Sequence, residues 1–403
     1  MTNKNVYFRD GAQWHRYETL SLRPMALTAF AHGPTMTALG IGASIDYMFN
    51  QIGWEGFANQ KHMTYRRLTL EFLSTLAYTP NCEKGFNRGR IAFRIFGYSY
   101  DCNIREMANL LDLPDGPHVF HEVPEDLYME GELNDFWSSI TGRPYHDLYP
   151  MLSTDIHNPT IRYFHMILAH TLFGKPESDN NVSREELFIM FCVFQSRQVN
   201  AVTFMFANFC KILRTEHYPI LIGGLVTKIA DALGFRTRLA QLDPLEDFRP
   251  MNVTFCLNKQ LIKDMGHHQF QLVINNVVMP HFTLPDHERT SVHNRKNWIY
   301  DLDEPIWEPE ETYPESEIDP ETSPHYYDLD YPENPMDESP MEEDNTNPIE
   351  KTKVALETFQ TEITRFKEEL ETMRVDVIGL RDIAVEQFDH LNQAVNSIRL
   401  NRG

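Results

Sequence analysis

The sequence predicts a mainly α protein with a minor β element, made of a helical globular body, a disordered acidic linker and a C-terminal coiled coil. Three observations support this. Apolar residues recur at helical spacing through much of the first 300 residues, residues 301–350 hold 19 acidic and no basic residues, and an apolar heptad repeat begins near residue 356. We expect a poorly ordered N-terminus over residues 1–40, a body over 41–300, a linker over 301–350 and a coiled coil over 351–403.

The first half of the body is expected to contain three helices and one strand. Apolar spacing predicts a short helix over residues 43–54 and a stronger one over 65–78, which Pro80 would end. Residues 89–98 alternate between the two faces of a strand, so they form the best strand candidate. Residues 103–111 again have helical spacing.

The centre of the body has clearer helix signals. Asn158 followed by Pro159 is typical of a helix start, and Gly174 is typical of its end. Ser183 and Glu186 have the spacing of a capping box, and the apolar run after them predicts a helix that continues to residue 213. A further helix is expected over 220–233, ended by Gly234, and its Gly223-Gly224 pair is expected to serve close helix packing. Residues 250–282 fit strands and helices equally well.

The C-terminal segment has the pattern of a coiled coil. Its apolar residues alternate spacings of three and four, and a four-residue step after Ala384 interrupts the repeat as a stutter. The expected seam consists of Leu356, Phe359, Ile363, Phe366, Leu370, Met373, Val377, Leu380, Phe388, Leu391, Val395 and Ile398.

Charges beside this seam favour identical chains in parallel. Acidic g positions face basic e positions only when the chains run in the same direction and in register. The expected interchain pairs are Glu362–Lys367, Glu369–Arg374 and Asp376–Arg381. The alternative is a long amphipathic helix folded back on its own body, which would not need charge patterning on both flanks.

The net charge of −22 is concentrated in one segment. Residues 1–300 hold 30 acidic and 28 basic residues, a net charge of −2, whereas residues 301–350 carry the excess acid and nine prolines. Such a composition is typical of an extended, solvated spacer. The spacer also contains Trp307, Tyr313, Tyr326, Tyr327 and Tyr331, so a short acidic and aromatic binding motif is the alternative.

The cysteines, the N-terminal residues and the apolar runs indicate the compartment of the protein. The five cysteines are widely spaced and include no Cys-x-x-Cys motif, as in proteins of a reducing compartment. The N-terminus has no apolar core typical of a secretory signal, and no apolar run approaches the length of about 20 residues that spans a membrane. We expect an intracellular protein, cytoplasmic or nuclear, with no membrane partner.

No motif for catalysis or cofactor binding emerges from the sequence. It lacks a zinc knuckle, an aspartic protease triplet, a P-loop and a serine nucleophile elbow. The histidines at 267, 268, 281, 287 and 293 have no spacing that suits a metal site and are expected to be loop and surface residues. His165 and His170 are expected to serve packing or to lie on a polar helix face. Arg88, Arg90 and Arg94 are weak candidate phosphate contacts; solvated surface charge is the alternative. We therefore expect no cofactor, no metal, no small-molecule substrate and at most weak nucleic-acid binding.

Several segments resemble one family. The stretch DIHNPTIRYFHMILAHTLFGKPESDNNVSREELFIM at 155–190 resembles the first-open-reading-frame protein of plant Athila-type retrotransposons, which are long-terminal-repeat elements. Similar matches occur at TYRRLTLEFLSTL (64–76), FRIFGYSYDCNIREMANLLDLPDG (93–116), FWSSITG (136–142) and ILIGGLVTKIADALGF (220–235). The resemblance covers roughly residues 40–240 and contains no catalytic motif. It implies a Gag-like or accessory role in the element.

The sequence thus predicts a non-enzymatic protein of retrotransposon origin that associates with itself through its coiled coil. Two alternatives remain. One is an adapted nuclear or cytosolic module that binds a protein partner through the body, and the other is a nuclease or transposase-like enzyme. Nucleic-acid binding at varied salt would distinguish the retrotransposon protein from the adapted module, and metal-dependent cleavage would identify the enzyme.

Overall fold

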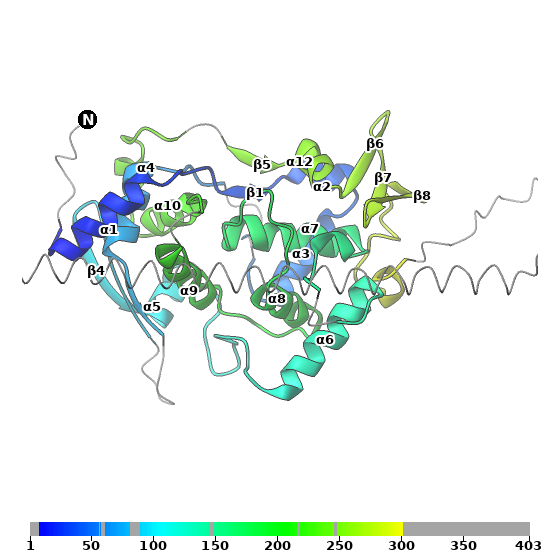
Figure 1. The fold of residues 1–403 in the computed structure, drawn as a ribbon, viewed down its shortest axis with the longest axis horizontal. Coiled ribbons are helices and arrows are strands. Elements are labelled where there is room, and N and C mark those ends of the chain that lie inside the picture. Colours follow the sequence, from blue (N-terminus) through cyan, green and yellow to red (C-terminus); the bar gives the residue numbers. More distant parts are fainter. Residues whose placement is uncertain are drawn as a thin grey trace, which may run out of the picture. The chain divides into compact units, whose positions relative to one another are not determined.

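A computed structural model describes residues 8–55, 57, 61–80, 89–145, 149–215, 218–245 and 248–300. The chain divides into two compact units, Met1–Glu311 and Thr312–Gly403, and all described residues belong to the first. That unit is a mixed α/β body with helices at its centre and three small sheets around them (Figure 1). The expected helical character is confirmed, but the β structure is more extensive than the minor element that the sequence predicted.

Residues 8–40 contain helices and a strand, which corrects the expectation of a poorly ordered segment for this part of residues 1–40. Helix α1 (Gly11–Leu22) begins at Asp10, whose side chain accepts a hydrogen bond from the Gln13 amide at 2.8 Å. Tyr17 and Leu20 are buried, and α1 packs against α4 (Arg66–Thr75). A short strand β1 (Ala29–Ala31) and helix α2 (Gly33–Ala38) follow. Burial against a distant helix, rather than local amphipathic spacing, stabilises this region.

The first two predicted helices are confirmed, and the second of them is shorter than expected. Helix α3 (Gly42–Gln51) lies within the predicted 43–54 helix apart from its first residue. Helix α4 is ten residues long and ends at Thr75, and β2 (Ala77–Thr79) takes the place of its expected last turn. The prediction of helix up to residue 78 was wrong because β2 pairs with β3 (Arg90–Ile95).

The predicted strand is the centre of an antiparallel sheet with the order β2-β3-β4. Strand β4 (Tyr98–Asn103) returns along β3 and leads directly into helix α5 (Ile104–Leu110). A capping box between Asn103 and Glu106 begins α5 where the sequence predicted a helix. Helix α6 (Leu127–Thr141) and the short η1 (Ser153–Asp155) connect this sheet to the core helices.

The central helices follow the sequence signals closely. Asn158 accepts hydrogen bonds from the Thr160 and Ile161 amides and starts α7 (Pro159–Ile167). The helix continues as one π-helical stretch, η2 (Leu168–Leu172), before Gly174 turns the chain at a φ of 55°. Both parts are buried along their whole length, so this segment forms the middle of the core.

The long helix predicted after Ser183 is in fact two helices. The capping box of Ser183 and Glu186 starts α8 (Arg184–Phe194), as expected. The chain then turns, with Ser196 at a φ of 50°, and Asn200 caps a second helix, α9 (Ala201–Arg214). The prediction of one helix to residue 213 was wrong because the polar residues 195–198 and Asn200 break it.

Helix α10 (Gly223–Ala232) confirms both the predicted helix and the close packing expected of its glycine pair. A Cβ on Gly223 would overlap the Thr64 side chain, and one on Gly224 would lie 3.0 Å from the Thr28 Cβ. Gly224 also donates its amide to the Thr28 hydroxyl at 2.9 Å. The short helix α11 (Arg236–Leu239) comes next.

Residues 249–284, which include the stretch 250–282 that the sequence left undecided, contain one helix and four strands. Strand β5 (Arg249–Met251) pairs in parallel with β1, so Ala29 lies opposite Arg249. Helix α12 (Val253–Asn258) leads to an antiparallel sheet of β6 (Ile262–Gly266), β7 (Gln269–Ile274) and β8 (Val277–Leu284). A last turn, η3 (Arg295–Asn297), ends the described chain.

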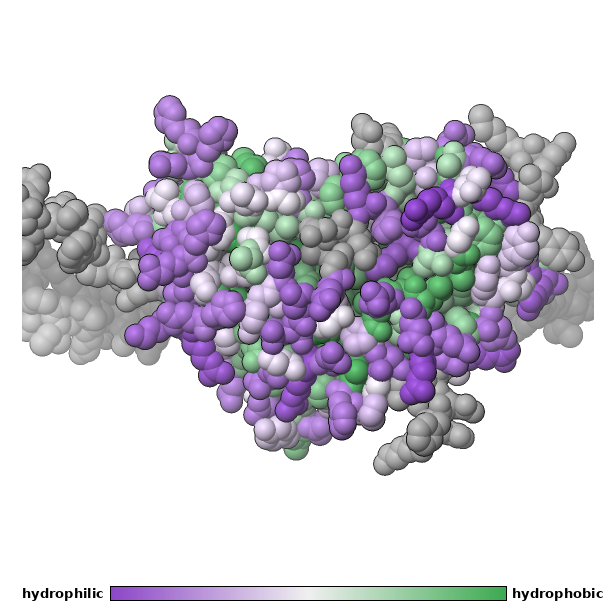
Figure 2. Space-filling model, turned by 180° about the vertical axis from the view of Figure 1, so that it is seen from behind, coloured by the Kyte–Doolittle hydropathy of each residue, from purple (hydrophilic) through white to green (hydrophobic). Residues whose placement is uncertain are grey.

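The buried apolar residues form one continuous core that includes side chains from α3, α4 and α7 to α10. Cys192 and Cys256 are free thiols buried within it. Outside, Figure 2 shows hydrophilic side chains over most of one face, with smaller hydrophobic patches between them. No helix of the described residues combines the length and the apolar character needed to cross a membrane.

Candidate binding pocket

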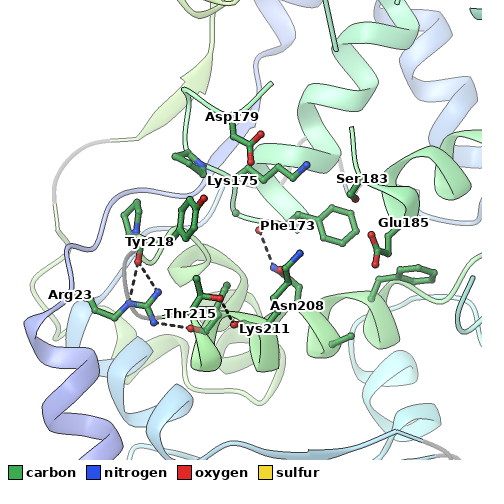
Figure 3. Close-up of a pocket in the computed structure, with 16 residues that line it drawn as sticks. Arg23, Phe173, Lys175, Asp179, Ser183, Glu185, Asn208, Lys211, Thr215 and Tyr218 are labelled. Atoms are coloured by element: carbon green, nitrogen blue, oxygen red, sulfur yellow. Dashed lines mark hydrogen bonds between the residues drawn. The ribbon is translucent and has the colours of Figure 1, made fainter. Parts of the chain in front are cut away.

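A pocket of about 280 Å³ lies between α9 and the loop that follows η2 (Figure 3). It combines aromatic and aliphatic side chains with both signs of charge. The residues that line it are Arg23, Phe173, Gly174, Lys175, Pro176, Asp179, Ser183, Glu185, Phe204, Ala207, Asn208, Lys211, Ile212, Thr215, Tyr218 and Pro219. Its volume is near the lower end of the range of about 300–1,000 Å³ that is typical of ligand sites.

Asn208 fixes one wall of the pocket to the other. Its amide nitrogen donates hydrogen bonds to the carbonyls of Leu172 at 3.4 Å and Phe173 at 3.0 Å. The end of a helix leaves such carbonyls without partners inside the helix. The Asn208 side chain, which belongs to α9, therefore provides hydrogen bonds to the carbonyls at the end of η2 and holds the Phe173 backbone at the pocket.

Arg23 performs the same task at the C-terminal end of α9. Its guanidinium donates to the Ile212 carbonyl at 2.7 Å and twice to the Tyr218 carbonyl, at 2.7 and 3.1 Å. A cation at a helix C-terminus is favoured by the helix dipole. This buried arginine fixes the backbone of Ile212 and Tyr218 at a second wall (Figure 3).

Beneath the loop lies a fully buried carboxylate, that of Glu186. Its Oε2 accepts hydrogen bonds from the Lys175 ammonium at 2.7 Å, the His165 Nε2 at 3.2 Å and the Ser183 amide at 2.7 Å. Burial alone would raise the pKa of Glu186, but the hydrogen bonds and charges of His165 and Lys175 outweigh burial and lower that pKa. The carboxylate is thus ionised and holds the loop to α7.

Two further buried bases stabilise the same loop. Burial lowers the pKa of His170 to about 3, so its imidazole is neutral at pH 7 and its Nδ1 can donate to the Lys175 carbonyl at 3.1 Å. Burial also lowers the pKa of Lys259 to about 8. Its ammonium donates to the carbonyls of Glu177 at 2.5 Å and Asp179 at 3.2 Å, and to the Asn180 side chain at 2.8 Å.

The side chains of this region therefore form a binding surface that buried hydrogen bonds hold in place. The buried Glu186, His165, His170 and Lys259 all hold backbone or each other, while Lys211 and Glu185 are exposed at the pocket. Such a pocket can bind an amphipathic group, with its rings and aliphatic carbons in contact with Phe173 and its charge beside the exposed side chains.

The residues that the sequence predicted as a self-association seam, and the six that would form interchain ion pairs, lie outside the described residues, as does Arg88. Arg90 is exposed and pairs with Asp101 across the β3–β4 hairpin. Arg94 is only 4% exposed, which corrects its assignment as a surface phosphate contact, because burial on β3 keeps its guanidinium from a polyanion.

The histidines predicted to be loop or surface residues occupy separate places. His267 and His268 form the β6–β7 turn, both at positive φ, and His281 is exposed on β8. His293 packs against Tyr47 with ring centroids 4.0 Å apart and the ring planes tilted by 49°. Within the described ranges no group of three or more His, Cys, Asp or Glu side chains has a metal-binding arrangement.

Sequence reasoning did not identify the pocket. Its walls come from residue 23, from residues between 173 and 185, from α9 and from residues 215, 218 and 219, which no single periodic pattern connects. The available signal was the Gly174-Lys175-Pro176 sequence at a helix end, which predicts an exposed turn but not what faces it.

A comparison with family models gives one match: residues 12–196 match the ATHILA ORF-1 family. The matched segment begins at α1, before the region in which the sequence resemblance was recognised, and ends before the 220–235 stretch. It contains the loop and the first turns of α8 at the pocket, but not α9. No curated protein and no solved structure matches the chain.

Proposed function

We propose that this chain is a non-enzymatic, Gag-like or accessory protein of a retrotransposon that associates with itself through residues 351–403; the match of residues 12–196 to the ATHILA ORF-1 family supports this origin. The body would bind a partner, and the coiled coil would multiply that binding. This proposal combines the family match with the pocket and the heptad pattern.

The observation that carries the non-enzymatic part is the use of the buried titratable groups. Catalytic acids and bases must reach a reacting group in a cleft. Here the Glu186 carboxylate is fully buried and accepts three structural hydrogen bonds, and the Lys259 ammonium donates three to a neighbouring loop. These groups support a wall of the pocket rather than chemistry inside it.

Self-association is supported by the charge pattern of the C-terminal segment, which lies outside the described residues. A parallel coil pairs Glu362, Glu369 and Asp376 with basic residues of the neighbouring chain. Linking several bodies in this way converts weak single contacts into strong overall binding, because each later contact becomes intramolecular. An assembly protein benefits directly from that gain.

The test is the oligomeric state of the full chain by sedimentation. The triple variant Glu362→Lys, Glu369→Lys and Asp376→Lys should dissociate at higher concentration. Three pairs along each side of a two-stranded coil, each worth about 0.3–0.5 kcal/mol, amount to about 2–3 kcal/mol, or roughly 30–150-fold in the dissociation constant.

Restoring complementarity provides the matched control. Adding Lys367→Glu, Arg374→Glu and Arg381→Glu to the triple variant recreates every pair with reversed sign, so association should recover. A full chain that is monomeric before any substitution, or a triple variant that associates as tightly as the parent, would contradict the parallel coil and return the segment to the folded-back alternative.

A further inference from the structure

The tip of the β3–β4 hairpin carries a surface that the proposed function does not use. Phe96 and Tyr98 from the hairpin meet Phe235 and Arg238, which lie at and within α11; we call these four residues the hairpin-tip patch. Ring centroids of Phe96 and Tyr98 lie 5.2 and 5.7 Å from that of Phe235. The chain thus gathers three aromatic rings, of which Tyr98 is exposed and Phe96 and Phe235 are half-buried.

Arg238 lies against these rings rather than in an ion pair. Its guanidinium carbon is 4.9 Å from the Tyr98 ring centroid and 5.7 and 5.9 Å from those of Phe235 and Phe96. One of its nitrogens donates to the Tyr98 hydroxyl at 3.1 Å. Arg238 is exposed and Tyr98 is 51% exposed, so the patch presents a cation and ring surfaces to solvent together.

The fold holds the hairpin tip in a strained conformation. Phe96 has a φ of 51° and Gly97 one of 80°. A bulky residue rarely adopts positive φ unless its surroundings enforce it. Here the buried Glu71 carboxylate enforces it, since its two oxygens accept from the Phe96 amide at 3.1 Å and the Gly97 amide at 2.7 Å. The strain places the Phe96 ring at the patch.

The chain itself contains a segment of complementary chemistry. Residues 301–350 combine 19 carboxylates with five aromatic residues and have no competing Lys or Arg. Carboxylates pair with guanidinium groups, and tyrosine and tryptophan rings stack on rings and on arginine. We propose that the acidic, aromatic segment 301–350 binds the hairpin-tip patch of its own chain.

Binding within one chain is favoured by connection and reach. A tethered ligand has an effective concentration on the order of millimolar, so even a weak contact is populated. Fifty residues span at most about 170 Å when extended, whereas a body of this size has a radius of gyration of about 19 Å. The segment can therefore reach any face of the body.

A nucleic acid fits the patch less well. Phosphate binding requires several cations that converge on one surface. Next to Arg238, the exposed Arg236 is already held by Asp231 through two hydrogen bonds of 3.0 Å. A polyanionic segment in the same chain would also compete with phosphates for these positions.

The test is photo-crosslinking in the full chain. A benzoylphenylalanine probe replaces Tyr98 and, as the control, Tyr128, which is 75% exposed on α6. Because residues 301–350 contain no Lys or Arg, trypsin releases them within one peptide, 297–351, which mass spectrometry identifies. We expect the probe at 98 to label this peptide at least about fivefold more than the probe at 128, and 1 M salt to reduce the labelling.

Two variants of the probe-bearing chain test the contacts. Arg238→Glu should lower the labelling at least about fivefold, whereas Arg197→Glu should not, although Arg197 is also an exposed arginine beside a ring, 5.7 Å from Phe120. Changing all five aromatic residues of the segment to Ser leaves the body intact and should also lower the labelling.

Binding within one chain is separated from binding between chains by adding Ile363→Asp and Leu370→Asp, which disrupt the expected seam. The labelling should persist and stay constant over a hundredfold dilution, whether or not the coiled coil forms. Equal labelling from both probe positions, labelling that falls on dilution, or adducts to nucleic acid instead of peptide 297–351 would each overturn the proposal.

Discussion

Two short loops of this protein are held by buried carboxylates in opposite electrostatic settings. At the pocket, Glu186 holds the 175–183 loop, and Lys175 and His165 neutralise its charge and lower its pKa. At the hairpin tip, Glu71 holds Phe96 and Gly97. There burial is the largest effect and raises the pKa of Glu71, although two backbone amides and the charges of Arg67 and Arg94 oppose it.

The difference shows that a hydrogen-bonding role does not by itself determine the cost of a buried acid. Both side chains satisfy backbone amides that would otherwise lack partners, but only Glu186 receives hydrogen bonds from cationic side chains. A direct counter-charge compensates the loss of hydration, whereas neutral amides compensate it only in part. Removing each carboxylate should therefore have unequal effects.

The largest expected effect is that of Glu186→Gln. It leaves the Lys175 ammonium without its counter-charge and weakens the capping box of α8, so the free energy of unfolding should fall by about 3–5 kcal/mol. Urea denaturation measures it. The neighbouring Glu185→Gln is the control: Glu185 is exposed on the same first turn, and its loss should cost no more than about 0.5 kcal/mol. Similar losses for both variants would contradict the role of Glu186.

A smaller loss is expected for Glu71→Gln. The amide oxygen of Gln can still accept one of the two backbone amides, but its nitrogen would face the other, which leaves a buried donor unsatisfied. The cost of such a group is about 1–3 kcal/mol, and relief of the buried charge offsets part of it. The same denaturation assay should therefore give a value below that of Glu186→Gln, and a larger one would reverse the comparison.

The smallest and most discriminating effect is the pH dependence of the loss of unfolding free energy that each of these two substitutions causes. The pKa of Glu186 is lowered in the folded state, so its stabilisation is present above pH 4.5 and is lost as pH falls through the folded pKa. The pKa of Glu71 is raised, so its charge is a cost above the folded pKa that acidification removes. As the pH falls from 6 to 4 and below, the loss of unfolding free energy caused by Glu186→Gln should shrink. The loss of unfolding free energy caused by Glu71→Gln should grow. Trends of the same sign would be inconsistent with the two settings.

Sequence reasoning succeeded where a signal and its structure are close together in the chain. The Asn158 cap, the Ser183–Glu186 capping box and the glycine stops at 174 and 234 act within one or two turns, so residue identity alone predicts them. The tight packing of Gly223 and Gly224 was also predicted, because two adjacent glycines in an apolar helix are best explained by the close approach of a neighbouring segment.

It failed where distant residues decide the outcome. Helix α1 is ordered because Tyr17 and Leu20 are buried, and residues 77–79 are a strand because β3 offers them partners. The parallel pair of β1 and β5 joins Ala29 to Arg249, and Arg238 reaches Tyr98 across 140 positions. No local pattern contains such pairings, so the hairpin-tip patch and the pocket could not be predicted.

The sequence by itself determined the family segment, the helix boundaries set by caps and glycines, the acidic segment and the heptad pattern, because each depends on near neighbours or on composition. Tertiary structure alone decided which charges became buried. Arg94 lies inside although the sequence predicted it at the surface, and Glu186 holds a loop because α7 brings His165 to it. The physical reason is that burial and charge compensation depend on the three-dimensional surroundings of a side chain, which only the packed chain defines.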